Sequence, residues 1–322
     1  MVCLHAATGN NTKPAAIERL EAQLSGVTVR YTTGEDLAEL LPGADVLFLW
    51  DYRSHALAAA WPAADRLRWV HAASAGVNHV LTDEVKASDV VVTNSRGVFD
   101  EPMAEYVLGV ALAFAKDLPT TLRLQHERRW HHRETERLAG QRALIAGTGP
   151  IGRAIARKLA AAGLSITGLG RRAIADDQDF GTVLPMTQLS GALAETDFLV
   201  LAAPLTEETS GMVDAAALAA MKPTARLINV GRGQLVVEDD LVDALRAGTI
   251  AGAALDVFAE EPLADTSVLW GLPNAMISPH MSGDVVGWRD ELVALFADNL
   301  DRFTTGRGLR NVVDKTHGYV RG

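Results

Sequence analysis

Short apolar runs alternate with amphipathic stretches along the first hundred residues of the chain. Each apolar run predicts a buried strand, and each stretch with apolar residues three or four positions apart predicts a helix. Strands that alternate with helices indicate a parallel sheet covered by helices on its faces. The predicted strands are residues 2–6, 27–31, 46–50, 67–71 and 90–93, and the predicted helices are 14–24 and 36–41.

The same alternation resumes after residue 142 and predicts a second, larger doubly wound unit. Its predicted strands are 143–146, 165–169, 197–202, 225–230, 252–257 and 275–278, with helices at 151–162, 215–221 and 241–247. Two long helices stand apart from this pattern. Residues 102–118 are apolar around most of the helix, which indicates burial in a core or at a subunit interface. Residues 285–303 have no strand after them, so we expect this helix to return to the first unit.

A complete G-x-G-x-x-G motif lies between the first predicted strand and the first predicted helix of the second unit. Its residues are Gly147, Gly149, Pro150, Ile151 and Gly152, with Thr148 after the first glycine. The first glycine permits a tight turn, the second lets backbone approach a pyrophosphate, and the third lets the helix pack on the strand. A free helix N-terminus then attracts phosphate. A strand–turn–helix–strand context within about thirty residues makes a dinucleotide site more credible than an ordinary glycine turn.

Composition excludes several classes of protein. The chain has 322 residues, 48% of them hydrophobic, and a net charge of −10, which is opposite in sign to a nucleic-acid-binding footprint. Its single cysteine, Cys3, allows no intrachain disulfide and fits a reducing compartment. No signal-peptide pattern opens the sequence, and no apolar run is long enough to cross a bilayer. We therefore expect a cytoplasmic protein that binds neither nucleic acid nor membrane.

Polar residues follow three predicted strands of the second unit, at the sheet edge where α/β proteins bind ligands. Arg232 lies between two glycines after one strand, and its planar guanidinium matches a carboxylate. Glu261 follows the next strand and precedes a proline, and His280 follows the last and is preceded by one. A histidine at this place is a candidate proton donor and acceptor. Taken singly, each residue is as well explained as a surface arginine, a helix-start acid or a structural histidine.

Together these loops and the glycine motif resemble the D-2-hydroxyacid dehydrogenase family, the D-isomer-specific NAD(P)-dependent class. The resemblance extends over almost the whole chain. It includes the segments 74–78, 92–98, 104–108, 203–209 and 269–274 as well as the three loops. It implies an α/β fold of two doubly wound parallel-sheet domains, with a Rossmann-type coenzyme domain inserted into a flavodoxin-like substrate domain. The implied substrate domain is residues 1–97 and 284–322, and the implied dinucleotide-binding domain is residues 98–283.

The resemblance also implies roles for individual residues. His280 would be the general acid and base, Glu261 its carboxylate partner, and Arg232 the group that binds the substrate carboxylate and polarises the 2-oxo group. Glu261 would favour the charged form of the imidazole, and this partner distinguishes hydroxyacid enzymes from related formate dehydrogenases. The backbone of Ala75, Gly76 and Val77 would also meet the substrate carboxylate. The remaining implied contacts are to the cofactor: Pro150 and Ile151 at the pyrophosphate, Pro204 and Thr209 near adenosine, and Val230, Asp256, Ser282 and Gly283 at the nicotinamide.

The residues after the second strand of the glycine unit depart from the pattern of NAD enzymes, which carry an acid there for the ribose hydroxyls. Here the position offers Arg171 and Arg172, and Asp176 and Asp177 come later. Arginines bind a 2′-phosphate well. The sequence therefore favours NADP(H), with NAD(H) as the alternative if both arginines are solvated or stack on adenine.

Several further expectations depend on this interpretation. The reaction would be reduction of a small 2-oxo acid such as glyoxylate or hydroxypyruvate to a D-2-hydroxy acid; the alternative is a nucleotide-sensing corepressor-like protein on the same fold. An apolar girdle on the helix of residues 102–118 needs a partner surface, and the resemblance implies that this partner is a second subunit of a homodimer. The girdle consists of Met103, Val107, Val110 and Phe114. The pair His131 and His132 is not expected to bind a metal, and no metal site is predicted. The identity of the 2-oxo acid and the physiological direction stay open. The sequence also leaves open whether three large aromatic residues line the substrate pocket or fill the core: Trp50, Tyr52 and Trp288.

Overall fold

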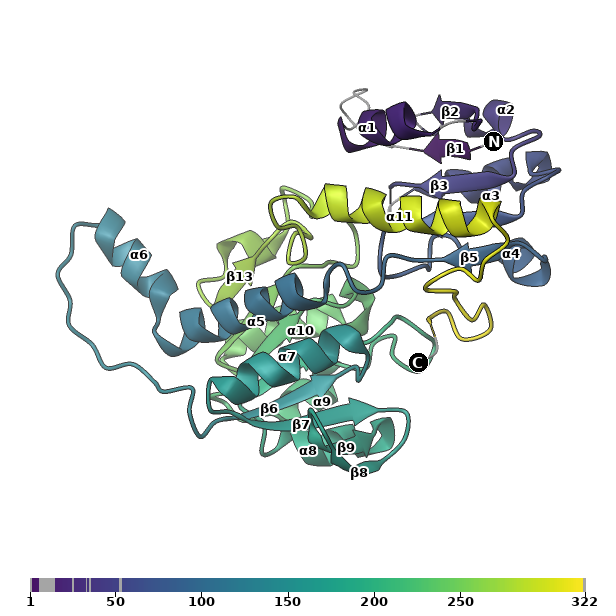
Figure 1. Cartoon of the computed structure of the whole chain (residues 1–322). Helices are drawn as coiled ribbons and strands as arrows, with labels where there is room; N and C mark the ends of the chain where they lie inside the picture. The colour runs from purple at the N-terminus through teal and green to yellow at the C-terminus, as the bar shows by residue number, and fades with distance from the viewer. Residues whose placement is uncertain are drawn as a thin grey trace. The chain divides into compact units, whose positions relative to one another are not determined.

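The computed structural model describes residues 2–5, 15–24, 26–32, 34, 36–51 and 54–320 (Figure 1). The chain forms two compact units, one of residues 1–99 and 285–322 and the other of residues 100–284. The first unit is therefore discontinuous, with the second inserted into it.

The first unit is built on a five-stranded parallel sheet in the order β2-β1-β3-β4-β5. This is the flavodoxin-like order expected from the family resemblance. Its strands are β1 (Val2–His5), β2 (Val29–Thr32), β3 (Val46–Leu49), β4 (Trp69–Ala72) and β5 (Val91–Thr93). Its helices are α1 (Ala15–Gln23), α2 (Leu37–Leu40), α3 (Ala56–Ala60), α4 (Asp83–Ala87) and α11 (Trp288–Thr304), with a 3-10 turn η1 (Trp61–Ala63).

Alternating side chains of the central strands enter two separate cores, as the period-two geometry of a strand requires. Val46 and Phe48 of β3 pack with α1 and α11 on one face of the sheet. Leu47 and Leu49 pack with α2, α3 and α4 on the other face. The predicted return of the last helix to the first unit is thus observed, because Phe296 of α11 stacks on Phe48 with ring centroids 4.1 Å apart.

The second unit contains an eight-stranded sheet in the order β13-β12-β11-β10-β6-β7-β9-β8. The Rossmann order is recognisable within it, with β6 at the topological switch point. Its strands are β6 (Arg142–Ala146), β7 (Ser165–Gly170), β8 (Ile174–Asp177), β9 (Gly181–Pro185), β10 (Phe198–Leu201), β11 (Arg226–Asn229), β12 (Gly252–Leu255) and β13 (Ala275–Ile277). Only the edge strand β8 runs antiparallel among the described strands, as half of a hairpin with β9 that the sequence did not predict.

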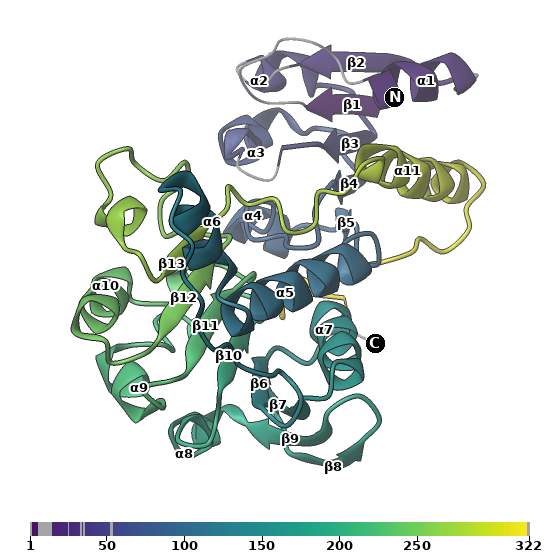
Figure 2. The ribbon, with the colours of Figure 1, turned by 90° about the vertical axis from the view of Figure 1, so that its left-hand side faces the viewer.

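Helices cover both faces of this second sheet (Figure 2). One face is covered by α8 (Leu189–Leu193), α9 (Ala215–Ala220) and α10 (Glu238–Ala247). The other is covered by α5 (Asp100–Ala115) and α7 (Pro150–Ala161). A further helix, α6 (Leu118–His126), and the 3-10 turns η2 (Met186–Gln188), η3 (Gly233–Leu235) and η4 (Val268–Gly271) complete the unit.

Helix α5 requires a correction to the argument for a homodimer. Val107 and Val110 are buried within their own unit, where they pack in one cluster with α7. Met103 and Phe114 are partly buried against the same cluster. The apolar girdle therefore needs no second subunit to cover it, although the homodimer itself stays a prediction. No helix of the described residues is both long and apolar enough to span a membrane.

Candidate active site

The glycine turn between β6 and α7 has the geometry that its spacing predicts. Gly147 adopts φ +111°, and a Cβ there would lie 2.5 Å from the Ala202 carbonyl oxygen. A Cβ on Gly152 would lie 1.8 Å from the Gly147 oxygen, so only glycine lets the helix approach the turn. At Gly149, which caps α7, no atom lies within 4 Å of a Cβ. Pro150 occupies the first helical turn. The turn thus leaves open space at the helix N-terminus, which fits a pyrophosphate.

The strand β7 ends beside this turn. A Cβ on Gly170 would lie 3.0 Å from the Thr148 hydroxyl oxygen, so the residues that follow start next to the glycine turn. Arg171 and Arg172 are exposed there. Asp177 is not available as an acid for ribose, because both of its oxygens accept hydrogen bonds from Arg153 at 2.8 and 2.9 Å. Hydrogen bonds from Arg153 hold the pKa of Asp177 at about 2.

The loop that carries Arg232 is fixed by Asn229, a buried residue that the sequence interpretation missed. The Asn229 amide donates to the Arg232 carbonyl oxygen at 2.9 Å, and its oxygen accepts from the Gly231 N–H at 3.1 Å. Arg232 is half-buried, and its Nη1 donates to the Gly231 carbonyl oxygen at 2.6 Å. A buried polar side chain at the end of an apolar strand was the available signal. Asn229 holds the turn that presents the guanidinium.

His280 and Glu261 form the closest ionisable pair among the candidate catalytic residues. The imidazole Nδ1 lies 2.7 Å from Glu261 Oε2, and the two side chains are 25% and 19% exposed. Glu261 Oε1 accepts a hydrogen bond from the Phe258 N–H at 3.0 Å. Burial pushes the Glu261 pKa upward, but the hydrogen bond and charge of His280, the Phe258 N–H and the charge of Arg232 outweigh it, so the pKa lies below its ordinary value. The charged carboxylate therefore orients the imidazole ring through Nδ1.

Asp256, which is 1% exposed, holds the loop on both sides of His280. Its carboxylate accepts hydrogen bonds from the Ser278 hydroxyl at 2.5 Å and from the N–H groups of Met281 and Ser282 at 2.9 Å each. Its carbonyl oxygen accepts from the His280 N–H at 2.8 Å. The sequence placed Asp256 beside nicotinamide, and the structure gives its side chain this supporting position within the catalytic loops.

The Arg232 and Glu261 loops also lie directly against each other. A Cβ on Gly233 would lie 1.8 Å from the Phe258 carbonyl carbon, so glycine is required at this contact. The amide of Gln234 donates to the Ala259 carbonyl oxygen at 2.9 Å. The structure therefore brings Arg232, Glu261 and His280 together on three braced loops at one edge of the sheet.

The other predicted site residues of this unit lie in neighbouring loops. Val230, Ser282 and Gly283 are buried in the loops of Arg232 and His280. Thr209 is buried as well, and its hydroxyl donates to the Pro204 carbonyl oxygen at 2.7 Å, so this hydroxyl shapes its own loop.

The predicted carboxylate loop belongs to the first unit and is held from within it. The Ser74 hydroxyl donates to the Gly76 carbonyl oxygen at 2.7 Å, and the Asn94 amide donates to that of Ala75 at 2.5 Å. Val77 is buried below them. The aromatic residues of this unit pack on its core, with the Trp50 and Trp288 rings stacked 6.5 Å apart, and Tyr52 lies outside the described residues.

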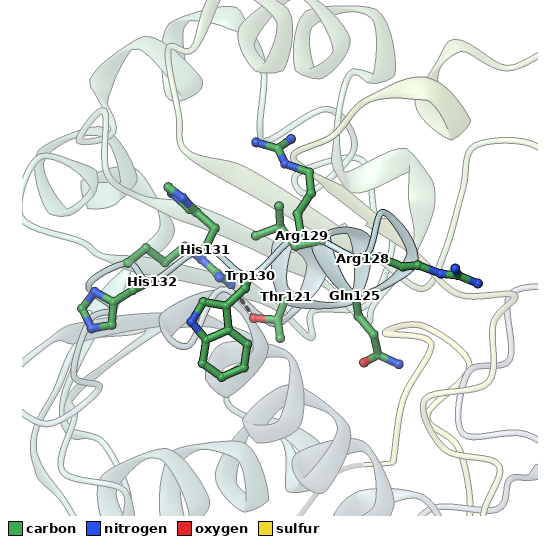
Figure 3. Close-up of a pocket in the computed structure, with 9 residues that line it drawn as sticks. Thr121, Gln125, Arg128, Arg129, Trp130, His131 and His132 are labelled. Atoms are coloured by element: carbon green, nitrogen blue, oxygen red, sulfur yellow. Dashed lines mark hydrogen bonds between the residues drawn. The ribbon is translucent and has the colours of Figure 1, made fainter.

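A groove of about 500 Å³ lies away from these loops, between α6 and the segment that follows it (Figure 3). Arginines and histidines line it together with Trp130, which is fully exposed. Arg133 is tied across it to Asp117 and Thr121. None of the predicted site residues line this groove. Within the described ranges, no group of three histidine, cysteine, aspartate or glutamate side chains is arranged to hold a metal ion.

The sequence and the fold of this chain are both similar to those of known proteins. Residues 108–282 match the model of the D-isomer specific 2-hydroxyacid dehydrogenase NAD binding domain. The glyoxylate reductase of Thermococcus gammatolerans is 33% identical over 263 residues, which span 78% of each chain. A D-isomer specific 2-hydroxyacid dehydrogenase family protein from Aeromonas salmonicida superposes with a TM-score of 0.82 at 32% identity, over 98% of this chain and 99% of that one. The NADPH-dependent glyoxylate/hydroxypyruvate reductase of Sinorhizobium meliloti, solved with NADP and sulfate, superposes with a TM-score of 0.85 at 28% identity, over 99% of each.

Proposed function

The chain belongs to the D-isomer specific 2-hydroxyacid dehydrogenase family, and from this premise we propose that it reduces a small 2-oxo acid with NADPH to a D-2-hydroxy acid. As a member of the family it is an NAD(P)-dependent enzyme that interconverts 2-hydroxy and 2-oxo acids. The inserted unit, residues 100–284, would bind the coenzyme, and the discontinuous unit would supply the remaining substrate contacts.

The observation that carries this proposal is the His280–Glu261 hydrogen bond of 2.7 Å, braced beside the Arg232 loop. The glycine turn of Gly147, Gly149 and Gly152 would hold the NADPH pyrophosphate, and the bound cofactor would supply a hydride to the carbonyl carbon of the 2-oxo acid. Negative charge then develops on the carbonyl oxygen, and His280 delivers the proton that neutralises it. Glu261 orients the ring through Nδ1, so Nε2 is the nitrogen that would deliver the proton.

Arg232 has the chemistry to bind the substrate. Its guanidinium carries five N–H donors in a planar fork, a geometry that matches a carboxylate. One of them, on Nη1, donates to the Gly231 carbonyl oxygen. A bidentate pair with the substrate carboxylate would fix the orientation of the 2-oxo group. The positive charge would also stabilise the developing oxyanion in a site with little water. In the first unit, the loop of Ala75, Gly76 and Val77 would add backbone N–H groups.

The preference for NADPH rests on the residues after β7. Arg171 and Arg172 are exposed at the end of that strand, and the Asp177 carboxylate further along the chain is paired with Arg153. A 2′-phosphate would therefore meet positive charge. The NADP held by the Sinorhizobium meliloti relative supports the same choice.

A panel of about ten 2-oxo acids, each assayed with NADPH and with NADH, tests the proposal. Glyoxylate and hydroxypyruvate lead the panel because relatives that reduce them match most of the chain. We expect turnover with at least one of the two, and a loss of about 10² or more in kcat for His280→Ala, the order that general acid catalysis supplies. The proposal fails if no 2-oxo acid is reduced, or if His280→Ala keeps the wild-type rate.

A further inference from the structure

A chain of hydrogen bonds runs from helix α5 into the catalytic loops. The Tyr106 phenol oxygen lies 2.6 Å from Ser278 Oγ, and the Ser278 hydroxyl donates to Asp256 Oδ1 at 2.5 Å. A serine hydroxyl has one proton, which is engaged with the carboxylate, so the phenol is the donor to Ser278. Burial raises the pKa of Tyr106, and the Asp256 charge adds to this against the opposing effect of the Ser278 hydrogen bond. The phenol therefore keeps the proton that it donates.

The chain ends at the backbone that carries His280. That residue adopts φ +53°, a left-handed conformation that side-chain-bearing residues rarely occupy and that costs about 1 kcal/mol or more. Such a conformation persists only where neighbouring contacts enforce it. Here Asp256 enforces it by accepting hydrogen bonds from Ser278 on one side of His280 and from Met281 and Ser282 on the other.

Helix α5 is a rigid support for this chain. Val107 and Val110, on the same helix as Tyr106, are buried in one cluster with Ile155 of α7. The first turn of α7 follows the glycine turn at Gly149. One helix thus packs on the element that carries the cofactor turn and also reaches the loop that carries the imidazole.

We propose that Tyr106 is a positioning residue for His280: its phenol holds Ser278, and through Ser278 and Asp256 it keeps the imidazole in the orientation from which it delivers a proton. The inference rests on the proposed role of His280.

Tyr106→Phe removes only the hydroxyl and tests the inference. We expect kcat for 2-oxo acid reduction to fall about fivefold, the equivalent of one ordinary hydrogen bond. NADPH affinity, measured by fluorescence titration, and the midpoint of thermal unfolding should stay close to wild type, because the ring still fills its place. The matched control is Tyr319→Phe, which removes a phenol hydroxyl from a ring that packs on His317 in the other unit, and it should keep the wild-type kcat.

A double-mutant cycle shows whether the two hydroxyls act in series. Ser278→Ala should lower kcat at least as much as Tyr106→Phe, and Ser278→Thr, which keeps a hydroxyl, should retain most of it. Adding Tyr106→Phe to Ser278→Ala should change kcat less than twofold further, because the phenol then has no serine to hold.

Three results would overturn the inference: a Tyr106→Phe kcat within twofold of wild type, a matching loss of NADPH affinity and thermal stability, or multiplicative effects in the double variant. The role of His280 is separated by His280→Ala. If His280→Ala keeps its activity, the proposed function is refuted. If His280→Ala is inactive and Tyr106→Phe keeps the wild-type kcat, only the role of Tyr106 is refuted.

Discussion

Replacing Gly233 by alanine should separate the loops that carry Arg232 and Glu261. The added Cβ would lie 1.8 Å from the Phe258 carbonyl carbon, 2.0 Å from its oxygen and 2.3 Å from the Ala259 nitrogen. Non-bonded carbon atoms rest at about 3.5–4.0 Å, so the two backbones must part by roughly 1.5 Å or more. All three obstructing atoms belong to backbone, and no side-chain rotation can relieve the contact.

A displacement of this size should lower kcat/KM for 2-oxo acid reduction about a hundredfold, since misplacing catalytic groups by about 1 Å has that effect. Overpacking should also destabilise the fold by about 1–3 kcal/mol. NADPH binding should survive, because the glycine turn at Gly147 is separate from this contact. Gly109→Ala is the matched control. Gly109 lies in α5 with no atom within 4 Å of its Cβ position, so alanine should keep activity and stabilise the helix by about 1 kcal/mol.

The assay combines initial rates of NADPH oxidation, NADPH titration and thermal unfolding followed by circular dichroism, on both glycine variants in parallel. The reasoning is refuted if Gly233→Ala retains more than a third of the wild-type kcat/KM. It is also refuted if activity and NADPH binding are lost in parallel, because the defect would then be general unfolding.

Glu261→Gln should lower kcat for 2-oxo acid reduction about tenfold or more, because a neutral amide holds the His280 ring less strongly than the carboxylate, whose charge-assisted hydrogen bond is worth about 1.5–3 kcal/mol. An unchanged kcat would contradict the pairing. The wild-type enzyme should prefer NADPH over NADH by about ten- to a hundredfold in kcat/KM, the range that a charge-assisted contact of about 1.5–3 kcal/mol supplies. Arg171→Asp combined with Arg172→Ala should remove most of this preference while NADH activity holds. Steady-state kinetics with both cofactors at one ionic strength test this, and a wild type that prefers NADH would refute it. Burial lowers the pKa of His71 from 6.5 to about 3, so as pH falls the unfolded chain binds the proton before the folded one does. The free energy of unfolding should therefore fall by about 1.4 kcal/mol per pH unit between pH 6.5 and 3. Urea titrations of the wild type should show this pH dependence and those of His71→Asn should not, whereas the same pH dependence in both proteins would contradict the assignment. Sedimentation at micromolar concentration should give a homodimer of about twice 34.4 kDa, and a clean monomer would exclude it.

The sequence was sufficient for the fold because its signals were local. Apolar runs located β6 and β10, and the spacing of Gly147, Gly149 and Gly152 identified the turn between β6 and α7. The hairpin of β8 and β9 was not predicted, because its exposed strand residues 174–176 carry no apolar alternation. The predicted helix of residues 102–118 runs past the end of α5 at Ala115, since the break before α6 depends on Asp117 at φ +47° in an otherwise helical pattern.

For the candidate active site, the family resemblance predicted roles for Arg232, Glu261 and His280, but the sequence did not point to the side chains that hold their loops. Asn229 and Ser278 lie within the same motifs, and their partners are set by tertiary structure rather than by spacing. Tyr106 is more distant still, 172 positions from the serine that it contacts. The girdle argument for a dimer failed for a related reason: an apolar pattern does not say whether its partner is another helix of the same chain or a second subunit.

The most direct test of the central claim is the configuration of the product. Wild-type protein and His280→Ala are incubated with NADPH and hydroxypyruvate, and the glyceric acid formed is resolved by chiral chromatography. The account predicts D-glycerate from the wild type, in amounts equal to the NADPH consumed, and a rate about 10² or more lower from His280→Ala. L-glycerate, consumption of NADPH without glycerate, or an undiminished rate in the variant would contradict it.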